Sequence, residues 1–329
     1  MTDGKGRKLK YWQAINQTLA AEMERDETVC AFGEDIAVGG GSFGATRGLL
    51  ERFGPNRVRD TPISELAIAA VGTGAAMTGT RPVLEIMYMD FIQLALDQVV
   101  NQAAKMRFMA GGAYSVPLTI RTLVASRMQS GPQHSQSFEA WLGSVPGLRV
   151  VWPSTAADAA GLLRAAIRSD DPVVFMESLA LWRAADEVPD EHVVPIGKAA
   201  VRRPGGDVTI VCVGGATIAA MAAAEELAGE GIEAEVLDLR SISPLDTEAI
   251  VTSVARTGAL VTVQDAPVPF GIGQAAVAAV AVADPTLFKA PPRVVGPPFS
   301  PTPFSPDLEK RFYPTSERIV AEVKAAVDR

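Results

Sequence analysis

The chain has 329 residues, enough for two domains of ordinary size, and its 48% hydrophobic and 21% charged residues exclude an intrinsically disordered protein. Its formal net charge is −8 with scattered acidic residues, so no basic stripe offers a surface to nucleic acid or to an anionic membrane. The two cysteines, Cys30 and Cys212, lie in apolar runs and indicate core thiols in a reducing compartment, although a single disulfide stays an alternative. The first ten residues are polar and no segment has 18 uninterrupted apolar residues, so we expect a cytoplasmic protein.

Short apolar runs alternate with longer helical patterns along the first half of the chain. Strands are expected at 28–33, 82–87, 116–121, 149–153 and 172–177. The segment 90–109 should be a helix whose apolar face contains Ile92, Ala95, Leu96, Val99, Val100, Ala103 and Met106. Thr155 is placed to cap a helix over 155–169. Apolar strands separated by helices favour a mostly parallel sheet covered on both faces.

A second α/β pattern follows a segment rich in charge, proline and glycine at 186–206, which we interpret as a linker. Strands are expected at 207–213, 233–239 and 259–265, with helices at 216–231, 246–258 and 315–327. The sequence therefore predicts an α/β fold with two doubly wound domains, at 1–185 and 207–329.

Glu65 precedes a helix that consists almost wholly of small and apolar residues. Such a helix has no polar face, so we expect it to be packed on all sides. Two interpretations of Glu65 follow. It is an ordinary first-turn residue favoured by the helix dipole, with Ser64 or Thr61 as the cap, or it is a carboxylate held in a dry place for chemistry.

His134 lies in the loop GPQHSQSFEAW (131–141), between two α/β units. Loops at strand ends carry binding groups in doubly wound sheets, and a histidine there can give or take a proton near neutral pH. A surface histidine without function explains the same residue equally well. The glycines at 39–44 and 212–217 match neither GxGxxG nor GxxxxGK[ST], and tight turns explain them best.

Several motifs occur together and in a particular order. They are DTPISE (60–65), RPVLEIMYMDFIQLALDQVVNQAAKMRFMAGG (81–112), QHSQSFEAWLGSVPGLRVVWPST (133–155), DLRSISPLD (238–246) and PFSPDLEKRFYPTSERI (303–319). The set closely resembles the beta subunit of thiamine-diphosphate-dependent 2-oxo acid dehydrogenase components, a family that includes the pyruvate, branched-chain 2-oxo acid and acetoin dehydrogenases. The resemblance covers nearly the whole chain. It implies a pyrimidine-binding transketolase-like domain followed by a transketolase C-terminal-like domain.

The resemblance also implies roles for four residues. Glu65 matches the glutamate that hydrogen-bonds a ring nitrogen of the aminopyrimidine and so activates the cofactor, a proton-transfer role. Ile63 matches a position that packs on the cofactor, and Phe91 matches the aromatic residue that lies against the pyrimidine. His134 matches a histidine that faces the substrate.

The same resemblance implies that metal ions are bound. A structural potassium ion is expected on backbone carbonyl oxygens, here those of Leu118, Ala166, Ile167, Ser169 and Asp171. The GDG…NN signature that binds magnesium and the diphosphate does not occur in these residues. We therefore expect an alpha subunit to supply that half of the site, in an α2β2 heterotetramer.

The expected activity is decarboxylation of a 2-oxo acid, or cleavage of acetoin, with transfer of the acyl unit to a lipoyl group on an acyltransferase core. The sequence departs from the family pattern in the loop 122–133, at Leu179 where a basic residue is common, and in VQDAPVPFGIGQ (263–274). Three alternatives stay open: delivery of an acyl or two-carbon unit to a carrier protein or another acceptor, a non-catalytic scaffold of the same fold, and a nicotinamide-dependent oxidoreductase. The last lacks its glycine fingerprint.

Overall fold

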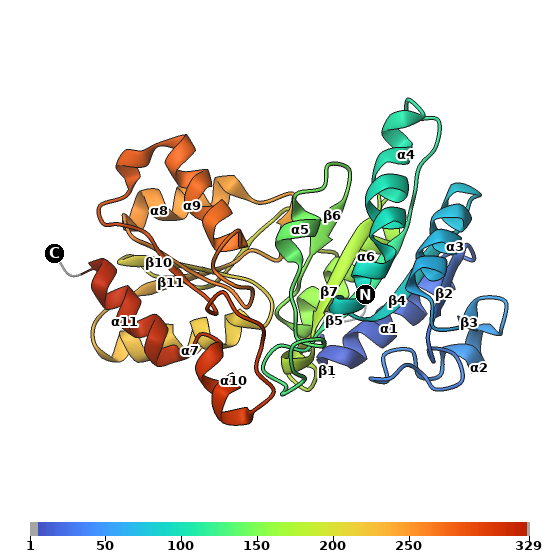
Figure 1. The fold of residues 1–329 in the computed structure, drawn as a ribbon, viewed down its shortest axis with the longest axis horizontal. Coiled ribbons are helices and arrows are strands. Elements are labelled where there is room, and N and C mark those ends of the chain that lie inside the picture. The colour runs from blue at the N-terminus through green and yellow to red at the C-terminus, as the bar shows by residue number, and fades with distance from the viewer. Residues whose placement is uncertain (1–5, 328–329) are drawn as a thin grey trace. The chain divides into compact units, whose positions relative to one another are not determined.

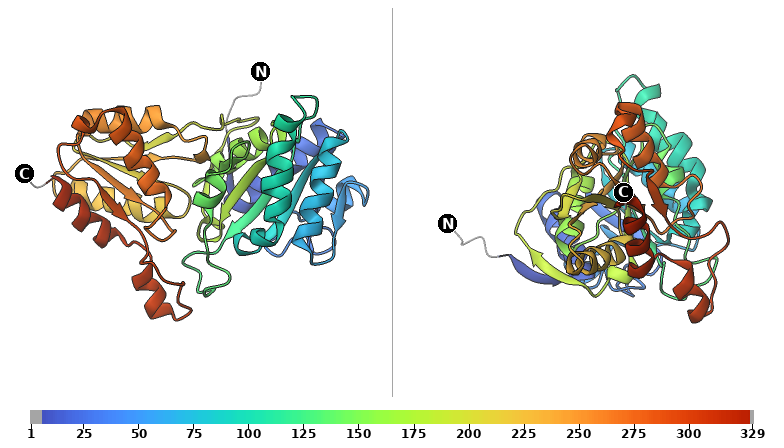
Figure 2. Two further views of the ribbon diagram at one scale, coloured as in Figure 1. Left: turned by 45° about the horizontal axis from the view of Figure 1, so that its top comes forward. Right: turned by 90° about the vertical axis from the view of Figure 1, so that its left-hand side faces the viewer.

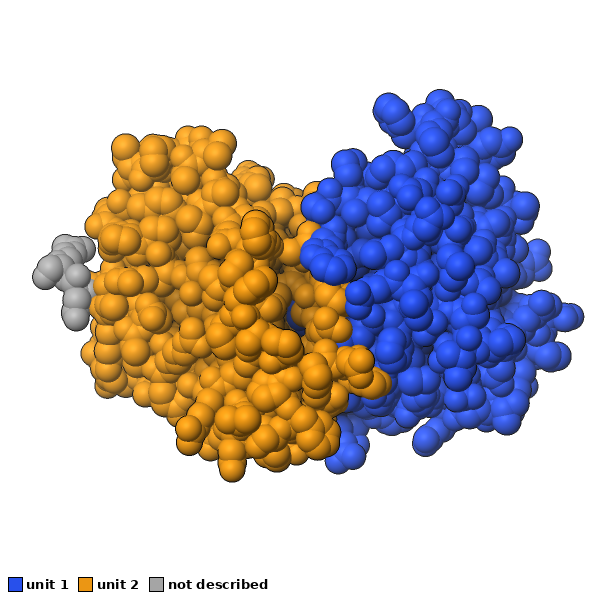
Figure 3. Space-filling model, in the orientation of Figure 1, with its two compact units in different colours: residues 1–124, 141–196 blue, residues 125–140, 197–329 orange. Residues whose placement is uncertain are grey.

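The computed structural model describes residues 6–327, which form two compact units (Figure 3). The first unit contains the residues up to 124 together with 141–196, and the second contains 125–140 together with the residues from 197 onward. This division differs from the predicted domains at 125–140. The segment clusters with the second unit because Asp265 accepts hydrogen bonds from Ser126 and Arg127, and Tyr313 donates one to the Ser135 carbonyl oxygen.

Six parallel strands of the first unit lie side by side in the order β6-β7-β5-β4-β2-β3 (Figure 1). Its strands are β2 (Val29–Gly33), β3 (Val58–Asp60), β4 (Arg81–Tyr88), β5 (Thr119–Val124), β6 (Arg149–Val151) and β7 (Val173–Ser178), while β1 (Arg7–Lys10) and β8 (Ala185–Val188) form a separate antiparallel pair. The helices are α1 (Tyr11–Arg25), α2 (Leu49–Phe53), α3 (Glu65–Met77), α4 (Ala104–Met109), α5 (Glu139–Gly143), which spans the boundary with the second unit, and α6 (Ala156–Arg168). The 3-10 helices η1 (Met89–Ala95) and η3 (Leu179–Leu181) and the π-helix η2 (Asp97–Ala103) complete the unit. The predicted parallel sheet is confirmed.

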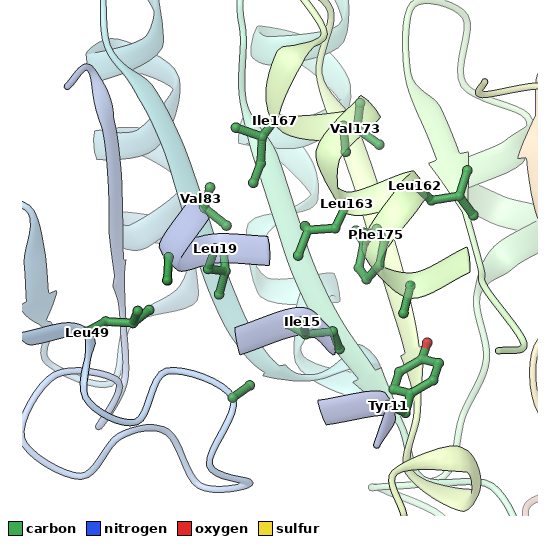
Figure 4. Close-up of a cluster of buried hydrophobic side chains, with 14 of the residues drawn as sticks. Tyr11, Ile15, Leu19, Leu49, Val83, Leu162, Leu163, Ile167, Val173 and Phe175 are labelled. Atoms are coloured by element: carbon green, nitrogen blue, oxygen red, sulfur yellow. The ribbon is translucent and has the colours of Figure 1, made fainter. Parts of the chain in front are cut away.

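Helices cover both faces of this sheet because its strands are apolar on both faces. Val83 and Leu84 are consecutive in β4 and therefore point to opposite faces. On the Val83 face, α1 and α6 form a core with the strands, whose members include Ile15, Leu19, Leu163, Ile167 and Phe175 (Figure 4). On the Leu84 face lies α3, where Gly72 faces the Leu84 side chain. A Cβ on Gly72 would lie 2.6 Å from Leu84 Cδ1, so the missing side chain sets how closely α3 approaches the sheet.

Two glycines of α3 should respond oppositely to alanine. Gly72→Ala should lower the free energy of unfolding by about 1–3 kcal/mol, because overpacking forces Leu84 to move. Gly74 has no heavy atom within 4 Å of a Cβ built on it, so Gly74→Ala should raise stability by about 0.5–1 kcal/mol through helix propensity alone. Urea unfolding of both variants checks this, and equal effects would contradict the packing argument.

The prediction that α3 is packed on all sides is wrong for this chain. Leu66 is 50% exposed and Val71 is 62% exposed, because the sheet covers only one face of the helix. The segment predicted as a single helix at 90–109 is η1, η2 and α4 in succession. Its predicted apolar face is retained: Ile92, Ala95, Val99 and Ala103 are buried, and Leu96, Val100 and Met106 are half-buried.

The second unit has a five-stranded sheet in the order β14-β13-β10-β11-β9. Its strands are β9 (Ala200–Arg203), β10 (Val208–Cys212), β11 (Ala234–Asp238), β13 (Leu260–Val263) and β14 (Arg293–Val295), and β12 (Ser241–Ser243) lies outside this sheet. The helices are α7 (Ala216–Gly229), α8 (Thr247–Thr257), α9 (Ile272–Ala283), η4 (Pro285–Leu287), α10 (Pro306–Phe312) and α11 (Ser316–Val327). The α7 and α11 helices pack side by side over one face (Figure 2).

The segment 186–206 is not a simple linker. It contains most of β8, which pairs with β1, and all of β9, which pairs antiparallel with β11. Cys212 is buried, Cys30 is half-buried, and both thiols are free, so the disulfide alternative is excluded. Among residues 6–327, no helix is both long and apolar enough to cross a membrane.

Candidate active site

The first unit offers a site where its sheet connections diverge. The strand β3, which follows β2 in the chain, lies on one side of β2. The next strand, β4, lies on the other side of β2. In open α/β sheets, ligands bind at the carboxyl ends of the strands at such a point. The segments that follow these strands contain Glu34 after β2, Ile63 and Glu65 after β3, and Phe91 after β4.

Glu65 is the first residue of α3, and its side chain is only 6% exposed. Ser64 occupies the N-cap position, yet its side chain makes no capping hydrogen bond. Within residues 6–327 the Glu65 carboxylate has neither a hydrogen-bond partner nor an ion-pair partner. Neither Glu65 oxygen is among the described side-chain atoms that are fully buried without a partner, so solvent still reaches the end of this side chain. An accessible carboxylate without a partner can bind a ligand, and the interpretation of Glu65 as an ordinary first-turn residue gives it no such role.

Acidic groups surround this position. Burial raises the pKa of Glu34, and the negative charges of Glu65, Asp35 and Glu85 raise it further. Asp60 fixes the loop after β2, because its carboxylate accepts hydrogen bonds from the backbone N–H groups of residues 37 and 38 at 2.6 and 3.2 Å. An excess of negative charge lies around Glu65, and such a place favours a group that brings a proton or a positive charge.

A series of edge-to-face aromatic contacts fixes Phe91. Its ring lies 5.9 Å from that of Tyr88, and the Tyr88 ring lies 5.7 Å from that of Phe43. Phe43 in turn contacts Trp182 at 6.0 Å, and the indole N–H of Trp182 donates to the Phe43 carbonyl oxygen. Ile63 is 82% exposed. Near Glu65 the first unit thus presents a half-buried aromatic ring in a fixed position and an exposed aliphatic side chain.

A buried charged triad crosses the sheet and was not predicted from the sequence. Arg121 is 2% exposed and lies between two carboxylates. Its Nε and Nη2 donate to Glu177 at 2.7 and 3.1 Å, and its Nη1 donates to Glu85 Oε2 at 2.7 Å. The signal in the sequence is one charged residue in each of three otherwise apolar strands, PVLEIM, VPLTIR and PVVFME.

This triad predicts a pH-dependent stability. Two carboxylates share one guanidinium, and burial raises the pKa of Glu177 from about 4.5 to about 7 against the attraction of Arg121. The folded state therefore holds a proton that the unfolded state releases, so stability is greatest at low pH and falls as pH rises through 7. The fall takes place between about pH 4.5 and 7, where the slope should approach about 1.4 kcal/mol per pH unit, and it levels off above pH 7. Urea unfolding between pH 5 and 8 should show this fall for the native chain and a flatter profile for Glu177→Gln, and identical slopes would contradict it.

His134 belongs to the second unit, whereas Glu65, Ile63 and Phe91 belong to the first. The segment that contains His134 is held by several bonds within its own unit. Arg127 donates to Asp265 at 2.8 Å and to the Pro314 carbonyl oxygen at 3.0 Å, and Glu309 accepts from the backbone of Gln129 at 3.0 Å. His134 is half-buried on this anchored loop.

The carbonyl groups predicted to hold potassium lie in the first unit, and each oxygen has a donor. Arg81 Nη1 donates to the oxygens of Ile167 and Ser169 at 3.1 and 3.0 Å. The oxygens of Leu118, Ala166 and Asp171 accept from Val173 N, Ser169 N and Ser169 Oγ. A carbonyl oxygen has two lone pairs, so these bonds leave capacity for a cation. Among residues 6–327, no group of three or more His, Cys, Asp or Glu side chains could hold a metal ion.

Comparisons with known proteins agree with this architecture. Residues 7–183 match the family model of the transketolase pyrimidine-binding domain, and residues 197–319 match that of the transketolase C-terminal domain. The beta subunit of acetoin:2,6-dichlorophenolindophenol oxidoreductase from Bacillus subtilis is 43% identical, over 94% of both chains. The 2-oxoisovalerate dehydrogenase beta subunit of the same organism is 42% identical, over 96% of this chain and 98% of the relative. The chain belongs to this family of beta subunits.

Further members extend the comparison. The beta subunit of the pyruvate dehydrogenase E1 component from Staphylococcus epidermidis is 40% identical, over 96% of this beta-subunit chain and 98% of the relative. A solved structure named "Split gene transketolase, inactive beta4 tetramer" covers 99% of each chain with a TM-score of 0.80 at 23% identity, which supports the fold alone. The predicted family and its two-domain transketolase-like fold are confirmed.

Proposed function

We propose that this chain is the beta subunit of a thiamine-diphosphate-dependent enzyme that decarboxylates a 2-oxo acid, or cleaves acetoin, and transfers the acyl unit to a lipoyl group. The observation that supports the proposal is Glu65, a buried residue at the carboxyl edge of a transketolase-type sheet, whose carboxylate has no hydrogen-bond or ion-pair partner within residues 6–327. The relatives are named as beta subunits of an acetoin oxidoreductase, a 2-oxoisovalerate dehydrogenase and a pyruvate dehydrogenase E1 component, which supports the substrate classes.

Each site residue of this chain would have its own role toward the cofactor or the substrate. Thiamine diphosphate, when bound, supplies the carbanion chemistry that side chains lack. Glu65 would hold a proton at a ring nitrogen of the pyrimidine, in surroundings dry enough to strengthen that hydrogen bond. Phe91, fixed by Tyr88, would lie against the ring, and Ile63 would exclude water from it. His134 would donate a proton to the substrate or orient it.

An alpha subunit would complete the site in an α2β2 heterotetramer. It would bind the magnesium ion and the diphosphate, for which this sequence has no GDG…NN signature. The apolar face of α3, with Leu66 and Val71 exposed, is a surface that a partner would cover. We further propose a cytoplasmic enzyme that docks on a lipoyl acyltransferase core.

Co-purification of this chain with a candidate alpha subunit tests the proposal. Calorimetry with thiamine diphosphate and magnesium should show binding to the complex and none to the isolated chain, because each chain provides half of the site. A screen of 2-oxo acids and acetoin would then identify the substrate. A stable complex that binds no cofactor would reject the catalytic role and favour the scaffold alternative.

Potassium should stabilise the chain if the proposed carbonyl site binds it. At equal ionic strength, potassium chloride should raise the free energy of unfolding by about 1–3 kcal/mol over sodium chloride, because binding to the folded state alone shifts the equilibrium. Thermal unfolding in the two salts measures the difference. Equal midpoints would show that the Arg81 guanidinium, already bonded to two of these oxygens, is the only cation that the site uses.

A further inference from the structure

The segment that contains His134 has a strained backbone. Arg127 and Gln129 have φ angles of 68° and 56°, in the left-handed region that residues with a side chain seldom adopt. Both precede His134 within residues 125–140 of the second unit. Strained conformations persist only where the surrounding contacts hold them, and they occur most often at functional sites. The contacts that hold this segment are therefore candidates for fixing the position of His134.

The Arg127 side chain contacts three other residues of the second unit. Its Nη2 donates to Asp265 Oδ1 at 2.8 Å, and its Nη1 donates to the Pro314 carbonyl oxygen at 3.0 Å. Its guanidinium carbon lies 5.1 Å from the centre of the Tyr313 ring. A planar guanidinium can make a forked pair of bonds and lie on an aromatic ring at once, which the single ammonium of a lysine cannot.

Two of these partners also bind other parts of the same segment. The Asp265 side chain is fully buried, and its Oδ2 accepts a hydrogen bond from the Ser126 hydroxyl at 2.9 Å. The buried Tyr313 donates its hydroxyl to the Ser135 carbonyl oxygen at 3.4 Å. The first of these serines precedes His134 in the chain and the second follows it directly. The partners of the arginine therefore hold the segment on both sides of the histidine.

A further contact holds the second strained residue. The backbone N–H of Gln129 donates to both carboxyl oxygens of Glu309 at 3.0 Å. An ion pair that only joined two parts of the fold would need no left-handed arginine. Because backbone strain lowers the free energy of unfolding, the combination of strain with a network of buried bonds is better explained by accurate positioning than by stability alone.

We propose that Arg127 is a positioning residue. Together with Asp265 and Tyr313, it fixes the backbone on both sides of His134 and so sets where this histidine lies. Its importance for the reaction rests on the proposed function, in which His134 acts on the substrate. The position of His134 can be measured without cofactor or substrate, so the two proposals can fail separately.

NMR of labelled histidine measures this position in the full-length chain. The chain has two histidines, His134 in the second unit and His192 in the first, so a carbon-13 label at the ring Cε1 gives two signals, which His134→Gln assigns. Arg127→Met should displace the His134 signal and leave the His192 signal in place. An unchanged His134 signal in this variant would overturn the proposal.

Arg127→Lys separates the geometry of the arginine from its charge. Lysine keeps the positive charge but cannot bridge Asp265 and Pro314 while lying on the Tyr313 ring, so it should displace the His134 signal as well. A native signal in Arg127→Lys would show that only the charge matters and would overturn the positioning role. Should Arg127→Met not fold, the lysine variant decides alone.

Arg203→Met is the matched control. The Arg203 side chain is 20% exposed, against 22% for Arg127, and it too pairs with a carboxylate and donates to a carbonyl oxygen, those of Glu233 at 2.7 Å and Ala234 at 2.8 Å. It lies in β9 of the same unit. The control should therefore leave both histidine signals in place. A His134 signal displaced equally by the control would show a general loosening of the unit and overturn the proposal.

The complex with the alpha subunit tests what this positioning does. Arg127→Met should lower kcat by about tenfold to a hundredfold, the usual effect of a misplaced reacting group. The affinity for thiamine diphosphate should stay within about twofold of native, because the variant leaves Glu65 and Phe91 of the first unit unchanged. Native kcat in this variant would reject the role in the reaction. A native complex that binds no cofactor would instead reject the proposed function, and the NMR signals would still decide whether Arg127 positions His134.

Discussion

The Glu65→Gln variant, reconstituted with its alpha subunit, should lose between about a hundredfold and ten-thousandfold of its activity, the usual contribution of a positioned proton-transfer group. Glutamine keeps the shape of glutamate but cannot hold the proton that the carboxyl group would share with the ring nitrogen. Folding should survive, because within residues 6–327 the Glu65 side chain makes no hydrogen bond or ion pair that the substitution would remove. Steady-state rates and calorimetric affinity for thiamine diphosphate, measured on the same preparation, separate lost chemistry from lost binding.

The control is Glu51→Gln on α2, which makes the same chemical change at an exposed first-turn residue. It should leave activity within about twofold of the native complex, since surface substitutions seldom matter. If Glu65→Gln behaves like this control, Glu65 is only a residue of the first helical turn. The scaffold alternative would then have the better support.

The strands could be predicted from the sequence because of how they are buried. A parallel strand covered by helices on both faces must be apolar throughout, and such runs are visible without any structure. The runs at 28–33 and 172–177 became β2 and β7 with shifts of one residue at their ends. The capping of α6 was also predictable, because a threonine bonds the backbone three residues later: Thr155 Oγ1 accepts from Asp158 N at 3.1 Å.

Membership of the segment 125–140 could not be predicted in this way. Local patterns describe neighbours in the chain, whereas this segment joins the second unit through Ser126 and Asp265, which are 139 residues apart. The exposed face of α3 has a similar cause. A helix without polar residues shows that all its faces avoid water, but not that some of them await another chain.

The candidate site was predictable only in part. Glu65 can be singled out in the sequence as an acidic residue before an apolar helix, and in the structure the residue is buried. The sequence does not predict the triad, because each member appears as a lone charge in its own strand. Only the sheet register, which places Glu85 directly beside Arg121, shows that the charges neutralise one another.

Arg121→Met should be the most destabilising of the substitutions considered, lowering the free energy of unfolding by about 3–5 kcal/mol. Methionine fills much of the same volume, so the loss comes from leaving the carboxylates of Glu85 and Glu177 buried without their cation. The effect should grow with pH, because protonation relieves it at acid pH. The matched control is Arg149→Met, since Arg149 pairs with Asp171 while 41% exposed, and it should cost at most about 1 kcal/mol.

The triple variant Arg121→Met, Glu85→Gln, Glu177→Gln separates charge from packing. With all three charges removed, most of the lost stability should return, because neutral groups of similar volume often replace a buried ion network at little cost. Urea unfolding at pH 6 and pH 8 measures both variants against the native chain. If the triple variant is as unstable as Arg121→Met alone, the arginine stabilises the sheet through its packed stem and not its charge. Recovery of stability would instead show that Arg121 stabilises the sheet because it neutralises the buried carboxylates of Glu85 and Glu177.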